Sequence, residues 1–243
     1  MKLAFITGAN KGIGFETALQ LGLKGFDILL GSRDTEKGEA AAAKLRAEGI
    51  TTYVIQLDMA DTASIQAAAE RVQRDFDHLD VLVNNAGVWL EGSNMGVSTV
   101  ATISQEDLAM TFQVNLFAQV DLTQRLLPAL KKAPAARIVN LSSILASLNL
   151  QADPKSETYG VKVFAYNSSK AALNSFTIHL AYELRNTKIK VNAAHPGWVL
   201  TDLGGPNAPM SVQEGAATSV RLATLDEDGP TGGYFFLDRA LPW

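Results

Sequence analysis

The 243-residue sequence has no cysteine, which excludes disulfide bridges and thiolate-ligated metal sites. Its three histidines, His78, His179 and His195, are far apart in the chain, so carboxylates alone remain as candidate metal ligands and we expect no metal site. No uninterrupted apolar run approaches the length of a membrane span, and Met1-Lys2 leads into an apolar segment without the hydrophobic core of a signal peptide. These absences predict a soluble, cytoplasmic protein.

Positive charge is also scarce. The formal net charge is -4, which argues against a surface that tracks nucleic-acid phosphates, so we expect neither a nucleic-acid nor a membrane partner. Hydrophobic residues make up 47% and charged residues 19% of the chain, a balance typical of globular proteins. No segment resembles a linker, so we expect a single domain over residues 1–243.

Strand-like and helical segments alternate along the whole chain. This alternation predicts an α/β fold in which a doubly wound, parallel sheet is covered by helices on both faces. The expected strands are 3–6, 26–30, 51–57, 80–83, 137–141, 189–194 and 234–237. The longest expected helices are 35–48, 104–132, 166–185 and 211–222.

A glycine-rich turn, Thr-Gly-Ala-Asn-Lys-Gly-Ile-Gly at 7–14, lies between the first expected strand and helix. Glycines at 8, 12 and 14 let a phosphate approach the backbone, and the free N–H groups and dipole of the helix start attract it. This favours a dinucleotide ligand. The spacing differs from G-x-G-x-x-G, and such a turn can also merely connect a strand to a helix.

The end of the second strand bears on the choice of cofactor. An NAD site usually places an acid there for the ribose 2′-hydroxyl, whereas a 2′-phosphate requires positive charge. Here Ser32 is followed by Arg33, and Lys11 in the glycine turn could approach the same phosphate, so we favour NADP(H). The alternative is that Arg33 and Lys11 are solvated and that Asp34 binds the ribose.

Polar or small residues follow the other strands. Asp58-Met59 could contact an adenine amino group or begin the next helix, and Asn84-Asn85-Ala86-Gly87 could pass beneath a flat ligand or simply form a turn. Ligands of open α/β sheets bind outside the carboxyl ends of the strands. We therefore expect one rim to hold these positions: Gly8, Arg33, Asp58, Asn85 and Ser143.

Tyr166 and Lys170 are four residues apart in an expected helix, so they lie on one face, although such a pair occurs often by chance. Asn115 lies among apolar residues of another helix, where it could satisfy a core group, mark a kink or bind a water. A loop at about 198–215, rich in glycine and proline, has the length of a lid. Residues 144–165 show no clear period.

In this order, the motifs resemble those of the short-chain dehydrogenase/reductase family. The matching residues are the glycine turn, Asn84 to Gly87, Asn115, Ser143 with Tyr166 and Lys170, and Pro196-Gly197 followed by Thr201. The resemblance covers essentially the whole chain and implies a single Rossmann domain with a seven-stranded parallel sheet. Within the family, the Asn-Lys, Ser-Arg-Asp and Pro-Gly-Trp-Val segments are most similar to NADPH-dependent carbonyl reductases.

The resemblance implies a role for each matching residue. Tyr166 would be the general acid in carbonyl reduction, Lys170 would favour its phenolate, Ser143 would bind the substrate oxygen and Asn115 would hold a relay water. Ser143 is chosen over its neighbour Ser142 by family register. The implied cofactor contacts are Gly8, Asn10, Lys11, Gly12, Ile13, Gly14, Arg33, Asp58, Met59, Asn85, Ala86, Gly87, Tyr166, Lys170, Pro196, Gly197, Trp198, Val199 and Thr201.

The substrate is expected to be a small apolar or aromatic carbonyl compound or alcohol. Residues 144–165 with Trp89, Trp198, Leu203 and Met210 would wall its pocket, or would only pack the core and lid. The segment between Ser143 and Tyr166 is of intermediate length for the family, so a monomer, a dimer or a tetramer remains open.

Three functions fit the sequence. The first is NADPH-dependent reduction of ketones or aldehydes. The second is reduction of a 3-ketoacyl group on a carrier protein, which would require a basic docking patch that is absent around 198–215. The third is a dinucleotide-binding sensor without turnover, which the complete Asn, Ser, Tyr and Lys set disfavours.

Overall fold

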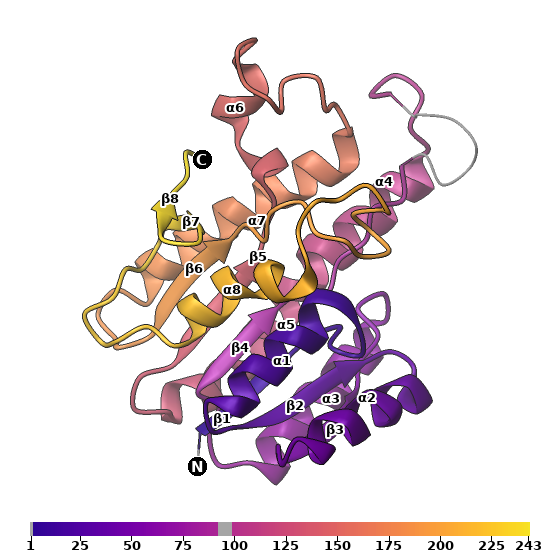
Figure 1. The fold of residues 1–243 in the computed structure, drawn as a ribbon. Coiled ribbons are helices and arrows are strands. Elements are labelled where there is room, and N and C mark those ends of the chain that lie inside the picture. Colours follow the sequence, from indigo (N-terminus) through magenta and orange to yellow (C-terminus); the bar gives the residue numbers. More distant parts are fainter. Residues whose placement is uncertain (1, 92–98) are drawn as a thin grey trace.

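The computed structural model describes residues 2–91 and 99–243. Their strands form one eight-stranded sheet (Figure 1). The strand order is β3-β2-β1-β4-β5-β6-β7-β8. The strands are β1 Lys2–Ile6, β2 Phe26–Ser32, β3 Thr52–Gln56, β4 Val81–Asn84, β5 Arg137–Leu141, β6 Lys190–Ala194, β7 Tyr234–Phe236 and β8 Arg239–Ala240.

All pairings from β3 to β7 are parallel, and the chain order reverses between β1 and β4. The predicted doubly wound α/β fold with seven parallel strands is therefore confirmed. Strand β8 was not expected; it pairs antiparallel with β7 and contains two residues. A strand this short carries no periodic signal in the sequence.

Helices cover both faces of the sheet (Figure 1). One face packs against α1, α2 and α8, and the other against α3, α5 and α7. The helical segments are α1 Gly12–Leu23, α2 Thr35–Ala47, α3 Thr62–Asp75, α4 Gln105–Phe112, η1 Gln113–Phe117, α5 Ala118–Lys132, η2 Ile144–Ala146, α6 Leu148–Ala152, α7 Phe164–Glu183 and α8 Val212–Ala223. No helix within the described ranges is long and apolar enough to cross a bilayer.

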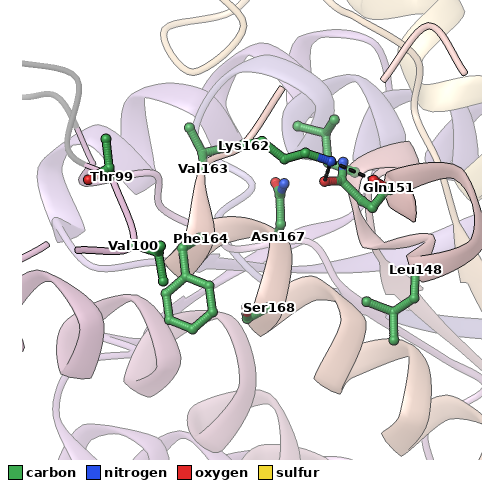
Figure 2. Close-up of a pocket in the computed structure, with 10 residues that line it drawn as sticks. Thr99, Val100, Leu148, Gln151, Lys162, Val163, Phe164, Asn167 and Ser168 are labelled. Atoms are coloured by element: carbon green, nitrogen blue, oxygen red, sulfur yellow. Dashed lines mark hydrogen bonds between the residues drawn. The ribbon is translucent and has the colours of Figure 1, made fainter. Parts of the chain in front are cut away.

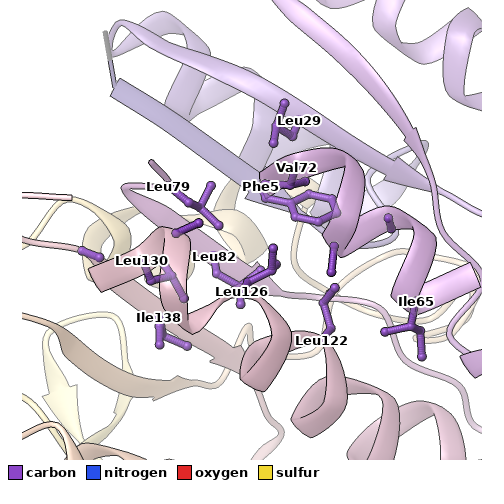
Figure 3. Close-up of a cluster of buried hydrophobic side chains, with 14 of the residues drawn as sticks. Phe5, Leu29, Ile65, Val72, Leu79, Leu82, Leu122, Leu126, Leu130 and Ile138 are labelled. Atoms are coloured by element: carbon purple, nitrogen blue, oxygen red, sulfur yellow. The ribbon is translucent and has the colours of Figure 1, made fainter. Parts of the chain in front are cut away.

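Two hydrophobic clusters hold these layers together. The larger one lies between the sheet and helices α3 and α5, where Phe5 of β1 and Leu82 of β4 meet Leu122 and Leu126 of α5 (Figure 3). Each of these four side chains is fully buried, so each removes apolar surface from water and stabilises the fold by about 1.5–3 kcal/mol. The sheet is thus a rigid platform for the loops at its carboxyl edge.

Several helix starts follow from local capping chemistry. The Asp34 side chain accepts a hydrogen bond from the Lys37 N–H at the start of α2, and Asp61 accepts one from Ala63 at the start of α3. Ser211 and Glu214 form a reciprocal capping box at α8. These side chains explain why the sequence predicts the starts of these helices closely.

The expected helix at 104–132 has an interruption. A π-helical turn, η1, separates α4 from α5 and contains Asn115, which is fully buried. The sequence indicated a kink or a water site as alternatives to a satisfied core amide at this position. The structure shows a local change in backbone hydrogen bonding, with the Ala118 N–H donating to the Gln113 carbonyl.

Candidate active site

The glycine turn leads from β1 into α1. Gly8 and Gly12 have φ angles of +63° and +58°, which favour glycine, and a Cβ at Gly14 would lie 2.5 Å from both the Asn85 Nδ2 and the Gly8 carbonyl oxygen. Helix α1 has no side-chain cap at Lys11 and no acidic residue in its first turn. Its N–H groups and positive dipole are therefore available to an anionic ligand, as a dinucleotide phosphate requires.

Residues that follow β4 hold the glycine turn in place through hydrogen bonds to Thr7. The Asn85 and Ala86 N–H groups donate to the Thr7 hydroxyl at 3.0 and 2.9 Å, and the Asn85 Nδ2 donates to the Thr7 carbonyl at 2.8 Å. The Asn84 Nδ2 donates to Asn140 of β5 at 2.8 Å. The two amides thus tie three strands together and hold Gly87 at the carboxyl edge of the sheet.

At the end of β2, the carboxylate of Asp34 caps a helix and the guanidinium of Arg33 is exposed to solvent. The Asp34 carboxylate caps α2 and lies 3.3 Å from Lys37, so it is already used within the protein. Arg33 is exposed and forms no ion pair with any described residue. This arrangement favours Arg33, rather than Asp34, as the group at this strand end that is free to meet a ligand.

Lys11 and Asp58 also have protein partners. The Lys11 ammonium forms an ion pair with Asp202, which follows the predicted contact Thr201, so this pair joins the glycine turn to the segment after β6. One Asp58 oxygen accepts from the Ala60 N–H at 2.9 Å, and Asp61 is the cap of α3. The other Asp58 oxygen forms no hydrogen bond within the described chain.

Tyr166 and Lys170 lie one turn apart on the buried face of α7. The Lys170 Nζ is 5.9 Å from the Tyr166 ring centroid, and it donates to the Leu141 carbonyl at 2.8 Å. Burial lowers the pKa of Lys170 to about 8. Burial raises the pKa of Tyr166 to about 12, although a hydrogen bond with Ser143 acts in the opposite direction.

The two neighbouring serines face different partners. The Ser142 hydroxyl donates to the Asn174 Oδ1 of α7 at 2.7 Å, whereas Ser143 is the serine that interacts with the Tyr166 phenol. The structure therefore places Ser143, and not Ser142, beside Tyr166. The main-chain carbonyl of Ser143 also accepts a hydrogen bond from the Tyr234 hydroxyl.

The amide of Asn115 is fully used by the protein. Its Oδ1 accepts from the Val88 N–H at 2.8 Å, and its Nδ2 donates to the Val88 carbonyl at 2.9 Å and to the Ser169 hydroxyl at 3.1 Å. Of the alternatives drawn from the sequence, the side chain thus satisfies core groups. It joins η1 both to the segment after β4 and to α7.

The segment after β6 is the one in which the sequence predicts a lid. Gly197 has φ +88°, and a Cβ there would lie 2.2 Å from the Met210 sulfur, so Met210 packs onto this turn. Val199 and Met210 form a β-bridge, and the Trp198 indole donates to the Gly204 carbonyl at 2.8 Å. Trp198 is 57% exposed and Leu203 41% exposed.

A cavity of about 490 Å³ lies beside the start of α7 (Figure 2). Its apolar wall combines Val100 and Phe164 on one side with Leu148 on the other, and Lys162 donates to Gln151 at its rim. The expected wall segment 144–165 contributes to it, but Trp89, Trp198, Leu203, Met210 and the catalytic candidates do not line it. The cavity thus lies next to the candidate site rather than within it.

Three further residues make contacts at the site that the sequence did not predict. The carboxylate of Glu91 binds the start of α7, Tyr234 holds the Ser143 carbonyl, and the His195 Nδ1 accepts from the Ile144 N–H at 3.1 Å. Burial lowers the pKa of His195 to about 4, so the imidazole is a neutral acceptor at neutral pH. Only tertiary contacts reveal these roles.

The ring of Trp89, which the sequence analysis places at the substrate-pocket wall, stacks on the Tyr166 ring, with centroids 5.3 Å apart and planes 22° apart. Within residues 2–91 and 99–243, no group of three His, Asp or Glu side chains is arranged to hold a metal ion.

Comparisons with known proteins identify the family of this chain. A family model described as short chain dehydrogenase matches residues 2–211. Carbonyl reductase (NADPH) 1 from Mus musculus is 35% identical over 279 aligned positions, covering 99% of this chain and 98% of the relative. Retinol dehydrogenase 12 from Mus musculus is 34% identical over 259 positions, covering 100% of this chain and 79% of the relative.

A solved structure of NADPH-bound carbonyl reductase from chicken fatty liver has the same fold, with a TM-score of 0.82. It is 28% identical, and the match covers 100% of this chain and 98% of that structure. The resemblance predicted from the motifs is therefore confirmed, and the chain belongs to the short-chain dehydrogenase/reductase family.

Proposed function

We propose that this protein reduces ketones and aldehydes to alcohols with NADPH, and that Tyr166 is the general acid. The single observation that carries the proposal is the buried cluster of Tyr166, Ser143 and Lys170 beside Gly87. A Cβ at Gly87 would lie 3.3 Å from both the Lys170 Nζ and the Asn115 Oδ1, so the backbone at the carboxyl edge passes directly beside the ammonium. A flat ring bound at this edge would meet all three side chains.

The enzyme uses NADP(H), as the names of its similar proteins and the open start of α1 support. When bound, NADPH supplies the hydride that adds to the carbonyl carbon. We assign the pyrophosphate to the glycine turn, the 2′-phosphate to Arg33 and Lys11, and the adenine to Asp58 and Met59. The ribose and nicotinamide are assigned to Tyr166, Lys170, Asn85 to Gly87, and Pro196 to Thr201.

The ionisation of the cluster suits reduction. With a pKa of about 12, Tyr166 is a protonated phenol at neutral pH, which is the form that donates a proton to the developing alkoxide. The positive charge of the Lys170 ammonium stabilises the negative charge that proton donation leaves on the phenolate. The Ser143 hydroxyl donates a hydrogen bond to the substrate oxygen as charge develops there.

The phenolate must then regain a proton from solvent. We propose that a water carries protons from solvent to Lys170, from which the phenolate is reprotonated. We place this water at the main chain of η1, because both polar atoms of the Asn115 side chain are already bonded to Val88 and Ser169. Asn115 then fixes the position of the π turn. In this view one domain over residues 1–243 holds cofactor and catalytic groups, and the lid at 198–215 covers them.

The substrate is a small apolar or aromatic carbonyl compound, because Trp89 stacks on the phenol and offers an aromatic surface beside it. The sequence offers no basic patch near the lid for an acyl carrier protein.

A panel of aryl and alkyl ketones and aldehydes, assayed in parallel with NADPH and NADH, tests the proposal. We expect NADPH-dependent reduction of several members and a loss of about 10²- to 10⁴-fold in kcat for Tyr166→Phe. Tyr182→Phe, at a tyrosine that lies outside the expected pocket wall and is 66% exposed, is the matched control and keeps full activity. No reduction by the wild type, or full activity in Tyr166→Phe, would contradict the proposal and favour a binding protein without turnover.

A further inference from the structure

The start of helix α7 is capped from a distant part of the chain. Glu91 follows β4 by several residues, is 8% exposed, and its carboxylate accepts hydrogen bonds from the Ala165 N–H at 3.0 Å and the Tyr166 N–H at 2.8 Å. The second of these N–H groups belongs to the residue that carries the candidate catalytic phenol. The carboxylate thus binds the backbone of Tyr166 directly.

Helix α7 has no cap of its own. Its N-cap residue, Val163, has no side-chain acceptor, and its first turn contains no acidic residue. The first N–H groups of a helix have no partner within it, and they carry the positive end of the helix dipole. Glu91 supplies both the missing acceptor and the matching negative charge, across 74 and 75 residues of sequence.

The same loop also holds the phenol ring. Trp89 stacks on Tyr166, so the segment 89–91 contacts one residue at two points, its ring face and its main-chain N–H. Lys170 lies on the same helix, 5.9 Å from that ring centroid. A shift of the helix start would therefore move the phenol relative to Gly87 and Ser143, which belong to the sheet edge.

A buried carboxylate is costly unless it is paired or well hydrogen-bonded. No Lys, Arg or His in the described residues lies within ion-pair distance of Glu91, so the two N–H groups and the helix dipole balance its charge. An ordinary Ser or Asp at position 163 could have capped the helix locally. The cap from the β4 side additionally fixes α7 against the loop that carries Gly87.

We propose that Glu91 is a positioning residue that sets the Tyr166 phenol at the distance the proton transfer needs. This inference rests on the proposed function, since it assigns Tyr166 the role of the acid. Glu91 touches neither substrate nor cofactor in this scheme. It acts through the Tyr166 main chain.

Glu91→Ala tests the inference with two readouts. We expect kcat for ketone reduction to fall by about 10- to 100-fold, while KM for NADPH and for the ketone change by less than about threefold, because misplacement of the acid affects proton transfer and not binding. Independently of activity, amide hydrogen exchange should accelerate at Ala165 and Tyr166, whose N–H groups lose their acceptor.

Glu91→Gln is the conservative variant. Its amide oxygen still accepts from the helix start, so we expect slower exchange than in Glu91→Ala and recovery of kcat to within about threefold of the wild type. Glu91→Gln also provides the test if the alanine variant does not fold. In that case, exchange at Ala165 and Tyr166 that is faster than in the wild type while kcat is unchanged would overturn the inference.

Asp61→Ala is the matched control, because it removes a carboxylate cap from α3, where Asp61 accepts from Ala63 at 2.9 Å. Loss of an exposed cap should lower Tm by about 2–4 °C and leave kcat unchanged. If Glu91→Ala behaves like Asp61→Ala, with a lower Tm and an unchanged kcat, Glu91 is a structural cap only and the inference is wrong.

The wild type and Tyr166→Phe are measured in the same series. If the wild type reduces no carbonyl compound, the proposed function fails while the exchange experiment still reports on the cap. If wild type and Tyr166→Phe behave as expected but Glu91→Ala keeps its kcat, only the positioning role fails.

Discussion

Helices α1 and α7 begin at the same edge of the sheet, yet their N-termini are treated in opposite ways. Helix α1 starts at a glycine turn with no side-chain cap and no acidic residue in its first turn. Helix α7 also lacks a local cap, but Glu91 fills the place of the missing acceptor. One helix start is kept free for a ligand, and the other is closed by the protein's own carboxylate.

The difference separates two tasks. An open helix start attracts phosphate and so contributes to cofactor affinity. A closed helix start cannot bind an anion, but it is rigid, and rigidity is what a proton donor needs for its alignment. Changes at α1 should therefore alter binding constants, and changes at α7 should alter rates.

The strongest test blocks the open helix start. Gly14→Ala places a Cβ 2.5 Å from the Gly8 carbonyl oxygen, so the turn must move, and we expect the Kd of NADPH to rise by about 100-fold or more. Fluorescence titration measures this. Gly22→Ala, at the other end of α1, is the control: its Cβ meets the Ile50 side chain at 2.4 Å, which lowers stability without affecting NADPH affinity. Equal affinity losses in both variants would contradict the comparison.

Lys11→Glu makes the start of α1 resemble that of α7 by adding a carboxylate to it. We expect the Kd of NADPH to rise by about 10- to 100-fold, and that of NADH by less, because a charged contact to the phosphates becomes repulsive. Lys11→Met, titrated alongside, separates loss of the positive charge from its reversal. An unchanged preference between the two cofactors would show that Lys11 does not approach the 2′-phosphate.

The α7 side should respond to pH. Burial lowers the pKa of Lys170 to about 8, so the ammonium is charged below pH 8 and neutral above it, while Tyr166 remains a phenol. We expect kcat for reduction to fall by about tenfold per pH unit above pH 8, with little change in the Kd of NADPH. In Lys170→Met, we expect a kcat that is low and does not change with pH over this range. A wild-type kcat that stays constant well above pH 8 would disprove the role of the ammonium.

The smallest effect is expected at Asp202. This residue pairs with Lys11, but their side chains are 80% and 69% exposed, and such surface pairs contribute little. Asp202→Asn frees Lys11 for the cofactor phosphate and should lower the Kd of NADPH by less than about fivefold. Weaker NADPH binding in this variant would indicate that the ion pair holds the lid closed over the cofactor.

The sequence predicted the fold because each layer has a local signal. Runs such as Ile28 to Leu30 are apolar and short, the glycines at 25 and 49 follow helices, and Asp34 and Asp61 cap the next ones. The carboxyl-edge rule then placed Gly8, Asn85 and Ser143 together without any knowledge of contacts. The alternation of elements is sufficient for this.

The finer structure of the site was not accessible in the same way. Glu91 follows a strand in a loop with no periodic pattern, and only packing brings it to the start of α7, 74 residues later. The choice between Ser142 and Ser143 depends on which side chain the turn directs toward Asn174. The π turn around Asn115 has no signature in the sequence, because its residues fit an ordinary helix equally well.

That π turn has one more consequence. A regular helix turns by about 100° per residue. The extra residue in the π turn therefore rotates the side chains of α5 about the helix axis relative to those of α4. The segment before it, α4, is oriented for contact with α7, and the segment after it, α5, for contact with α3. Deleting a single residue between Gln113 and Phe117 would straighten the helix but rotate Leu122 and Leu126 out of the core. The position of Asn115 and the packing of the hydrophobic interior therefore both depend on the extra residue of this turn.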